Sequence, residues 1–229
     1  MNDDILVVGC GTGIGQEVTT QLEGMGKKVI GTSRSERNNV ANFYTLDVLD
    51  PSSFPDLQNP LSGIVYCPGS ITLKPFRSLK DEDFLKEFEL NLLGFVRVIR
   101  KYLPNLLEAT DASVVSFSTV AAQLGLPYHT SIAASKGAME SLIKSLAAEF
   151  APKIRFNGIA PSLTDTPLAK SLLDSETKRK TSEDRHPLKQ VGNPKDIASL
   201  AIWLLSESSK FTTGQIFGIN GGLGNIRPN

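Results

Sequence analysis

ILVVGCGTGIG, residues 5–15, is the most informative stretch of the chain. Four apolar residues are followed by glycines at positions 9, 11, 13 and 15, and a helical pattern of apolar residues runs over 13–25. Glycines let the backbone approach a ligand closely, and a helix N-terminus presents free N–H groups and positive potential to a pyrophosphate. At the first turn from strand to helix, this pattern predicts a dinucleotide-binding loop; a tight turn without a ligand is the alternative. The loop residues expected to contact the ligand are Gly9, Gly11, Thr12, Gly13, Ile14 and Gly15.

Short apolar runs alternate with amphipathic stretches along the rest of the chain. Helical periodicity continues at 81–103, 131–150 and 194–206. The expected strands are 5–9, 28–32, 42–48, 63–67, 113–118, 154–160 and 215–220. Such alternation is typical of a parallel sheet that is covered on both faces. We therefore predict an α/β fold, a single domain over residues 1–229, with one Rossmann-type, doubly wound parallel β-sheet of about seven strands and helices on both faces.

Two connections depart from this regular pattern. The second and third predicted strands are separated by only about ten residues, SRSERNNVAN, which hardly accommodate a full crossover helix. An irregular connection is expected there. The segment 162–190 is rich in Ser, Thr, Lys and Asp and follows the carboxyl end of a strand, so it is a candidate lid.

The end of the second predicted strand, GTSRSER at 31–37, bears on the choice of dinucleotide. An acidic residue at this place binds the ribose 2′-hydroxyl of NAD, but Ser33 and Arg34 stand here. A guanidinium pairs with a 2′-phosphate through two hydrogen bonds, and the serine adds a hydroxyl. NADP(H) is therefore favoured over NAD(H), with an ordinary surface charge as the alternative role of Arg34.

The composition argues against several classes of function. The chain has 229 residues, of which 24 are basic and 24 acidic, and no basic run, so no nucleic acid is expected as a partner. No apolar run approaches the length that crosses a bilayer, so no membrane association is expected. Two cysteines and two histidines are too few for a disulfide framework or a convincing metal site. The acidic start, MNDDILVVG, is unlike a signal peptide, and a cytoplasmic location is expected.

Further motifs resemble the short-chain dehydrogenase/reductase family over nearly the whole chain. GCGTGIG at 9–15 is similar to its cofactor loop, and TTGQIFGINGG at 212–222 is similar to its last strand. LDVLD at 46–50 resembles the segment whose aspartate contacts adenine, and VYCPG at 65–69 keeps only the final glycine of the usual Asn-Asn-Ala-Gly. NGIAPSLTDTP at 157–167 resembles the segment beside the nicotinamide. By this resemblance, the remaining cofactor-binding residues are Asp47, Val48, Pro68, Gly69, Lys136, Pro161, Thr164 and Thr166.

The resemblance also implies an active site, and one of its members is missing. ELNLLG at 89–94 places Asn91 at the family's active-site asparagine. The family motif is Tyr-x-x-x-Lys, with a serine thirteen residues before the tyrosine. Counting back from Lys136 places Ile132 at the tyrosine and Thr119 at the serine. A lysine among small residues needs a partner, and ribose hydroxyls of the cofactor are expected for Lys136, but isoleucine can exchange no proton.

Three explanations for the missing tyrosine remain open. Tyr128 or His129 could donate the proton, or could serve only in packing. A related branch, the enoyl-acyl-carrier-protein reductases, places its tyrosine seven residues before the lysine, where His129 stands. The substrate could instead be a conjugated alkene or a quinone-like acceptor, for which Thr119 and Asn91 suffice. In the third explanation the chain binds cofactor without turnover, and Ile132 belongs to the core.

The preferred interpretation is an NADP(H)-dependent oxidoreductase of the short-chain type. It transfers hydride between nicotinamide and a small carbonyl, enone or quinone-like substrate, at an atypical acid–base site. The candidate catalytic residues are Asn91, Thr119, Lys136, Tyr128 and His129. The alternative is a catalytically inactive NADP(H)-binding regulatory or assembly protein. The resemblance implies a homotetramer or a homodimer, built partly from the helices at 81–103 and 131–150.

Overall fold

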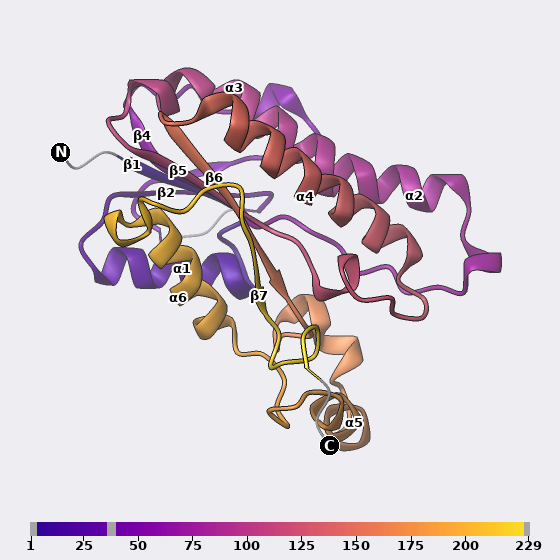
Figure 1. Cartoon of the computed structure of the whole chain (residues 1–229). Helices are drawn as coiled ribbons and strands as arrows, with labels where there is room; N and C mark the ends of the chain where they lie inside the picture. Colours follow the sequence, from indigo (N-terminus) through magenta and orange to yellow (C-terminus); the bar gives the residue numbers. More distant parts are fainter. Residues whose placement is uncertain (1–3, 36–39, 227–229) are drawn as a thin grey trace.

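The computed structural model describes residues 4–35 and 40–226 of the chain. Within these ranges seven strands form one sheet in the order β3-β2-β1-β4-β5-β6-β7, and every neighbouring pair is parallel. The strands are β1 (Asp4–Val8), β2 (Val29–Ser33), β3 (Phe43–Thr45), β4 (Leu61–Tyr66), β5 (Ala112–Phe117), β6 (Ile154–Pro161) and β7 (Ile216–Ile219). The predicted doubly wound parallel sheet is confirmed (Figure 1).

Helices cover both faces of the sheet. The α-helices are α1 (Gly13–Gly24), α2 (Asp81–Phe88), α3 (Gly94–Glu108), α4 (Thr130–Phe150), α5 (Glu176–Arg185) and α6 (Pro194–Leu205). Figure 1 shows α1 and α6 on one face and α3 and α4 on the other, with α5 apart from both layers. In the part of the chain that the structure describes, no helix combines the length and the apolar character of a membrane span.

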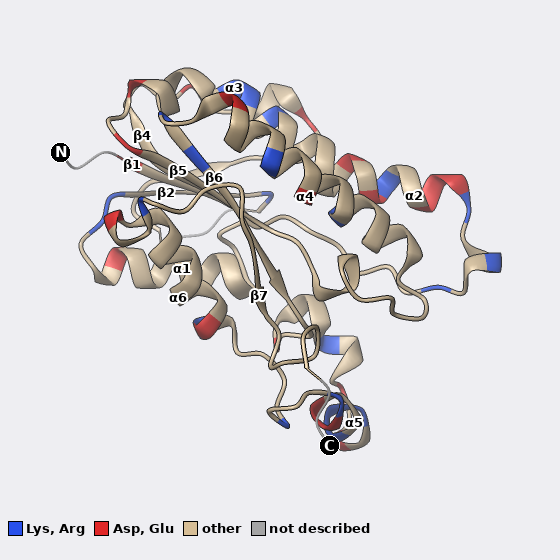
Figure 2. Ribbon diagram, viewed as in Figure 1, with Lys and Arg blue, Asp and Glu red and all other residues tan. Residues whose placement is uncertain are grey.

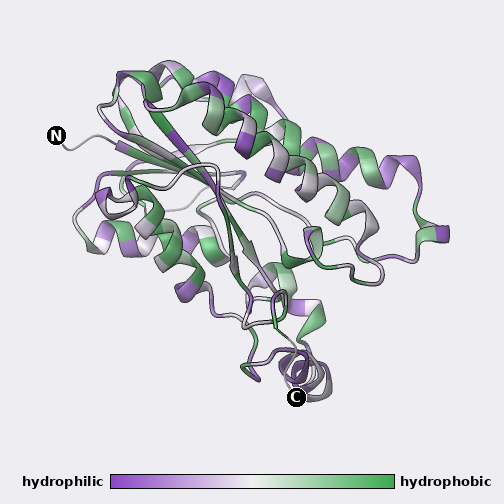
Figure 3. Cartoon of the chain, in the orientation of Figure 1, coloured by the Kyte–Doolittle hydropathy of each residue, from purple (hydrophilic) through white to green (hydrophobic). Residues whose placement is uncertain are grey.

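Alternate residues along each strand enter two separate cores. Along β1, Leu6 and Val8 join the core beneath α3 and α4, whereas Ile5 and Val7 join the core beneath α1 and α6. Because both faces of a parallel sheet are covered, β1 is apolar at every position after Asp4, which accounts for the run ILVV. The helices that cover the sheet present apolar residues to it, and Figure 3 shows apolar and polar residues alternating around them.

The helix predicted over 81–103 is interrupted in the structure. After α2 a π-helical turn covers Glu89–Leu93, and α3 then continues to residue 108. In the wide turn the carbonyl of Leu90 accepts a 2.6 Å hydrogen bond from the hydroxyl of Tyr66 on β4. A donor from outside the helix thus stabilises the widened turn, and such turns are frequent at functional sites.

The third strand is shorter than the predicted range 42–48. It ends at Thr45, and the chain turns at Asp47, whose carboxylate accepts the N–H of Leu49 at 2.9 Å. Aspartate side chains that bind nearby backbone groups compete with a sheet ladder, which explains the early end. The irregular connection expected before this strand includes residues 36–39, which lie outside the described residues.

The polar segment 162–190 has secondary structure of its own. It contains a 3₁₀ helix over Pro167–Leu172 and the helix α5. An ion pair of 2.7 Å between Arg179 and Asp165 connects α5 with the chain that follows β6. Figure 2 shows charges of both signs on α5. The candidate lid is therefore a helical element at the carboxyl ends of the strands.

Candidate functional site

A large cavity lies where the strand order of the sheet reverses, between β1 and β4. At such a point the loops leave in opposite directions and open a crevice at the carboxyl ends of the strands. The cavity has a volume of about 880 Å³ and extends to residues of α5. Every cofactor-binding residue predicted from the sequence lines it, and so do Thr119 and His129. Asn91 and Tyr128 are not among its lining residues.

The glycine loop is held tightly between strands. The N–H groups of Gly9 and Cys10 donate to the carbonyl of Thr32 on β2 at 2.8 and 2.9 Å. A Cβ atom on Gly15 would lie 2.2 Å from the carbonyl oxygen of Gly9, so a larger residue does not fit. The first turn of α1 has no acidic residue, and the side chain of Thr12 does not cap it. The N–H groups of this turn are therefore available to an anion such as a pyrophosphate.

Two polar side chains lie at the β2 end of the cavity. Ser33 ends β2, and the exposed Arg34 follows it. Asp47, after β3, lines the same cavity together with Val48. A guanidinium suits a phosphate, and a carboxylate suits the amine of a purine, so this end has the chemistry of a nucleotide site.

Lys136 is buried on α4 and reaches the same cavity. Its ammonium donates to the carbonyl of Phe117, at the end of β5, over 2.7 Å. Burial lowers the pKa of Lys136 to about 8, while the charge of Glu87 opposes this shift. A Cβ atom on Gly69 would lie only 3.7 Å from its Nζ atom. One of the three ammonium protons is used by Phe117, and the others can be donated to hydroxyls of a ligand.

Thr119 and Ile132 also face the cavity. The hydroxyl oxygen of Thr119 accepts the N–H of Ala121 at 3.3 Å, so its own proton can be donated into the cavity. Ile132 is 5% exposed and precedes Lys136 by one helical turn. An aliphatic side chain at this position contributes shape but no proton.

Asn91 lies behind the cavity wall, fully buried in the π-helical turn. Its Nδ2 atom is 2.7 Å from the carboxylate of Glu87 and 3.3 Å from the hydroxyls of Ser70 and Ser135. Its Oδ1 atom has no donor among the described residues, and a Cβ atom on Gly69 would lie 3.6 Å from it. Ser70 lines the cavity, so this polar network reaches the cavity through it.

The two candidate proton donors before α4 have different surroundings. Tyr128 is 58% exposed, with a positive φ of 70°. His129 lines the cavity, and its Nδ1 atom is 2.7 Å from the carbonyl oxygen of Pro127. A carbonyl partner places a proton on Nδ1, so Nε2 of the neutral ring is an acceptor and donates only when the imidazole is charged.

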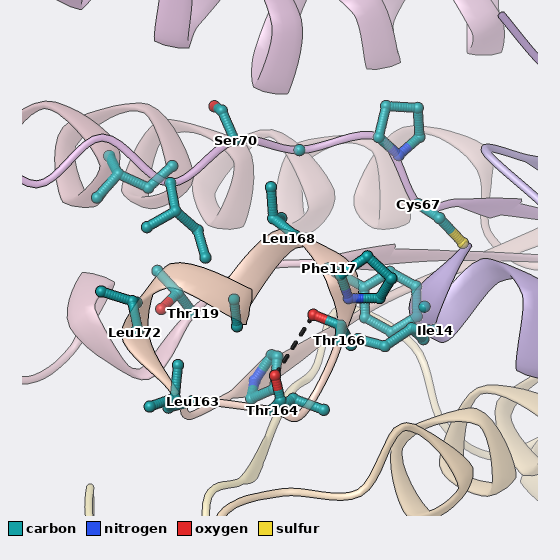
Figure 4. Close-up of a pocket in the computed structure, with 18 of the residues that line it drawn as sticks. Ile14, Cys67, Ser70, Phe117, Thr119, Leu163, Thr164, Thr166, Leu168 and Leu172 are labelled. Carbon is teal, nitrogen blue, oxygen red and sulfur yellow. Dashed lines mark hydrogen bonds between the residues drawn. The ribbon is translucent and has the colours of Figure 1, made fainter. Parts of the chain in front are cut away.

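The far end of the cavity is mainly apolar. It is bordered by residues that follow β4, β5 and β6, across the sheet from Arg34. Figure 4 shows Leu163, Leu168 and Leu172 with Thr119 among the residues drawn around it. Apolar walls with a few polar groups are typical of sites for small organic ligands.

Two pairs of side chains at the site were not identified from the sequence. Glu87 is buried and bonded to Ser70, and the only signal was a glutamate one helical turn before Asn91. His186 is also buried, and its Nε2 atom is 2.8 Å from the hydroxyl of Ser162 on the cavity wall. Among the described residues, no group of three or more His, Cys, Asp and Glu is placed to hold a metal ion.

Comparison with known proteins agrees with this geometry. Residues 9–224 match the family model described as Enoyl-(Acyl carrier protein) reductase. The chain is 29% identical over 238 residues to 3-oxoacyl-[acyl-carrier-protein] reductase FabG of Thermotoga maritima, with 95% of this chain and 96% of that protein covered. The chain belongs to the short-chain dehydrogenase/reductase family, and its fold is that of an oxidoreductase of this type.

Solved structures of similar proteins have the same fold. The ligand-free aldohexose dehydrogenase AldT of Thermoplasma acidophilum superposes with a TM-score of 0.90 at 25% identity, covering 100% of this chain and 96% of that one. The structure of ElxO with NADP bound gives a TM-score of 0.87 at 26% identity, covering 97% and 99% of the two chains.

Proposed function

We propose that the chain is an NADP(H)-dependent oxidoreductase that acts on a small carbonyl, enone or quinone-like substrate. The observation that carries this proposal is a single cavity that joins a glycine loop, Arg34 and Lys136. The glycine loop offers N–H groups to the pyrophosphate, Arg34 pairs with the 2′-phosphate, and Lys136 donates to ribose hydroxyls. The bound NADP in the similar protein ElxO supports the choice of cofactor.

The residues around the far end of the cavity have distinct roles in this proposal. When bound, the cofactor supplies or accepts a hydride at its nicotinamide ring. Pro161, Thr164 and Thr166, at and after the end of β6, hold the nicotinamide side of the cavity. Thr119 donates a hydrogen bond from its hydroxyl to the substrate oxygen and stabilises the negative charge that develops there, and Asn91 fixes the polar network behind it. The apolar walls exclude water.

We further propose that Ile132 occupies the position of the family's catalytic tyrosine. Its burial, its place on the cavity wall and its spacing of one turn from Lys136 support this assignment. General acid–base catalysis supplies roughly 10²–10⁴-fold, so a substrate that delocalises the incoming charge is favoured over a simple ketone. His129 is the candidate donor for substrates that need a stronger acid, and Tyr128 is a weaker one because its side chain is exposed.

The second candidate function is a catalytically inactive NADP(H)-binding regulator or assembly protein. The aliphatic side chain of Ile132 beside a complete cofactor site favours it.

In either case we propose a cytoplasmic homotetramer or homodimer. Phe76, Leu85 and Leu93 are exposed apolar residues in and around α2 and support an interface on that side of the molecule.

Cofactor titration followed by turnover tests the proposal. NADPH and NADH are titrated into the protein while nicotinamide fluorescence is recorded, and a panel of ketones, enones and quinones is then offered with the better cofactor. We expect tighter binding of NADPH and faster consumption of enones or quinones than of ketones. Tighter binding of NADH would overturn the role of Arg34. Strong NADPH binding with no acceptor consumed would establish the inactive alternative.

A further inference from the structure

One buried carboxylate beside the cavity has no role in the reaction described above. Glu87, near the end of α2, is 2% exposed, and none of the ion pairs among the described residues includes it. Its Oε1 atom has no hydrogen-bond donor in the described part of the chain. A buried carboxylate is costly unless donors or a positive charge stabilise it. A buried carboxylate at this position therefore requires a physical explanation.

Hydrogen bonds fix this carboxylate against the wall of the cavity. Its Oε2 atom accepts from the hydroxyl of Ser70 at 2.5 Å and from the amide of Asn91 at 2.7 Å. The same amide lies 3.3 Å from the hydroxyl of Ser135, which donates to the carbonyl of Ile132 at 3.1 Å. The network thus connects α2 and the loop after β4 with the turn of α4 that carries Lys136. Figure 4 shows Ser70 on the loop that follows β4 and borders the cavity.

Lys136 supplies the positive charge that this network otherwise lacks. The Nζ atom of Lys136 and the Oδ1 atom of Asn91 both lie close to Gly69, at 3.7 and 3.6 Å from the place of a Cβ atom there. The charge of Glu87 raises the pKa of Lys136 against the lowering that burial causes. The negative charge of Glu87 thus favours the ammonium form of Lys136.

The other titratable groups around this pair have different partners or smaller effects. Burial raises the pKa of the Cys67 thiol, after β4, far above its usual range, so this side chain is neutral beside Lys136. On the helical segment that contains Glu87, the carboxylate of Glu89 pairs with Arg97 at 2.5 Å, and the carboxylate of Asp83 pairs with Lys74 at 2.7 Å. Glu87 is therefore the main source of negative charge for Lys136.

We propose that Glu87 is a positioning residue of the cofactor site, whose carboxylate orients Asn91 and Ser70 and whose charge keeps Lys136 an ammonium. The inference rests on the proposed function, in which Lys136 donates to ribose hydroxyls. A neutral amine at this position is a poorer donor. Removal of the negative charge therefore lowers the pH at which cofactor binding begins to weaken.

The test compares Glu87→Gln with the unaltered protein across pH 6.5–9.5. Glutamine keeps an acceptor for Ser70 and Asn91 but has no charge. We expect NADPH affinity of the unaltered protein to fall above about pH 8, and the midpoint of this fall to move down by roughly one pH unit in the variant. At pH 8.5 the variant then binds NADPH roughly tenfold more weakly, while affinities at pH 6.5 agree more closely.

Glu89→Gln is the matched control, because it removes a carboxylate two residues away that is already paired with Arg97. The Glu89→Gln variant also controls for titration of the cofactor itself. The midpoint of its fall in NADPH affinity with pH should equal that of the unaltered protein. Equal midpoints for Glu87→Gln and Glu89→Gln would overturn the inference. Absence of any nucleotide binding by the unaltered protein would instead overturn the proposed function.

A second measurement examines the charge pair without cofactor. Since the pKa of Lys136 is lower in the folded than in the unfolded protein, its ammonium costs stability below about pH 8, and this cost is relieved as the pH rises. The rise in unfolding free energy should begin at lower pH in Glu87→Gln. If that variant does not fold, the double variant Glu87→Gln, Lys136→Met probes the pair, because removal of both charges leaves neither one unpaired in the interior. The double variant should fold, and its failure to fold would overturn the inference.

Discussion

At the scale of the residue, we propose that Ile132 limits the chemistry of the site. It lies on the cavity wall one helical turn before Lys136, at the position proposed for the family's catalytic tyrosine. We expect Ile132→Tyr to raise kcat/KM for ketones with NADPH by roughly 10²–10⁴-fold, because a general acid is restored. Ile132→Phe is the control, since it adds the same ring without the hydroxyl. Equal ketone reduction by the two variants would show that the missing hydroxyl is not the limitation.

In the proposed function, Arg34 determines the choice between the two nicotinamide cofactors. It is exposed and lines the β2 end of the cavity. There a guanidinium would pair with the 2′-phosphate of NADPH, which NADH lacks. We expect Arg34→Ala to weaken NADPH binding by roughly tenfold to a hundredfold, in line with about 1.5–3 kcal/mol for a hydrogen bond to a charged group. NADH affinity, measured in the same fluorescence titration, should stay within about twofold. A parallel loss for both cofactors would assign Arg34 a general structural role.

At the scale of the element, the widened turn between α2 and α3 positions Asn91. Periodicity predicted one helix over 81–103, yet a hydroxyl from β4 holds the carbonyl of Leu90 and the helix widens there. Burial raises the pKa of Tyr66 far above its usual range, so this hydroxyl remains protonated and donates throughout the working pH range. The side chain of Asn91 is thereby turned into the polar network with Glu87.

Tyr66→Phe tests the contribution of this hydrogen bond. The substitution leaves a buried carbonyl without its donor, so we expect the unfolding free energy to fall by about 1–3 kcal/mol in denaturant titration. Tyr44→Phe is the control, because Tyr44 is 40% exposed and its substitution should change stability by less than about 0.5 kcal/mol. If both variants have the stability of the unaltered protein, the widened turn does not depend on Tyr66.

At the scale of the whole molecule, the cavity proposed to hold the cofactor connects segments that are far apart in the chain. The cavity wall takes residues from the glycine loop, the ends of β2, β4, β5 and β6, and α4 and α5. A ligand that binds only the assembled wall stabilises the whole fold by mass action. NADPH at a hundred times its dissociation constant should add about 2.7 kcal/mol, which raises the melting temperature of a chain of this size by roughly 5–10 °C.

Gly15→Ala should abolish this thermal shift. A Cβ atom at Gly15 would lie 2.2 Å from the carbonyl oxygen of Gly9, so the loop must move and lose its approach to the pyrophosphate. Gly24→Ala, at the other end of α1, is the control, since a Cβ atom there would meet nothing within 4 Å. The readout is the difference in melting temperature with and without NADPH. A full shift in Gly15→Ala would contradict the proposed position of the pyrophosphate.

The parallel sheet and most helix positions followed from the sequence, because these features depend on local patterns. Continuous apolar runs predicted buried strands, and the glycine spacing predicted the loop that the structure places against β2. Motif positions such as Asp47 and Thr166, far apart in the chain, also predicted residues that line one cavity. Each of these signals is carried by a segment of about twenty residues or fewer, so no knowledge of distant contacts was needed.

Contacts between distant segments were decided only by the tertiary structure. The break in the helix at 89–93 depends on Tyr66, more than twenty residues earlier. The sequence also did not predict the burial of Glu87, since a glutamate on a helix is ordinarily solvent-exposed. Its position beside Lys136 exists only once α2, α4 and the loop after β4 are packed together. The electrostatic energy of a charge depends on what surrounds it in space, and a linear pattern does not contain that information.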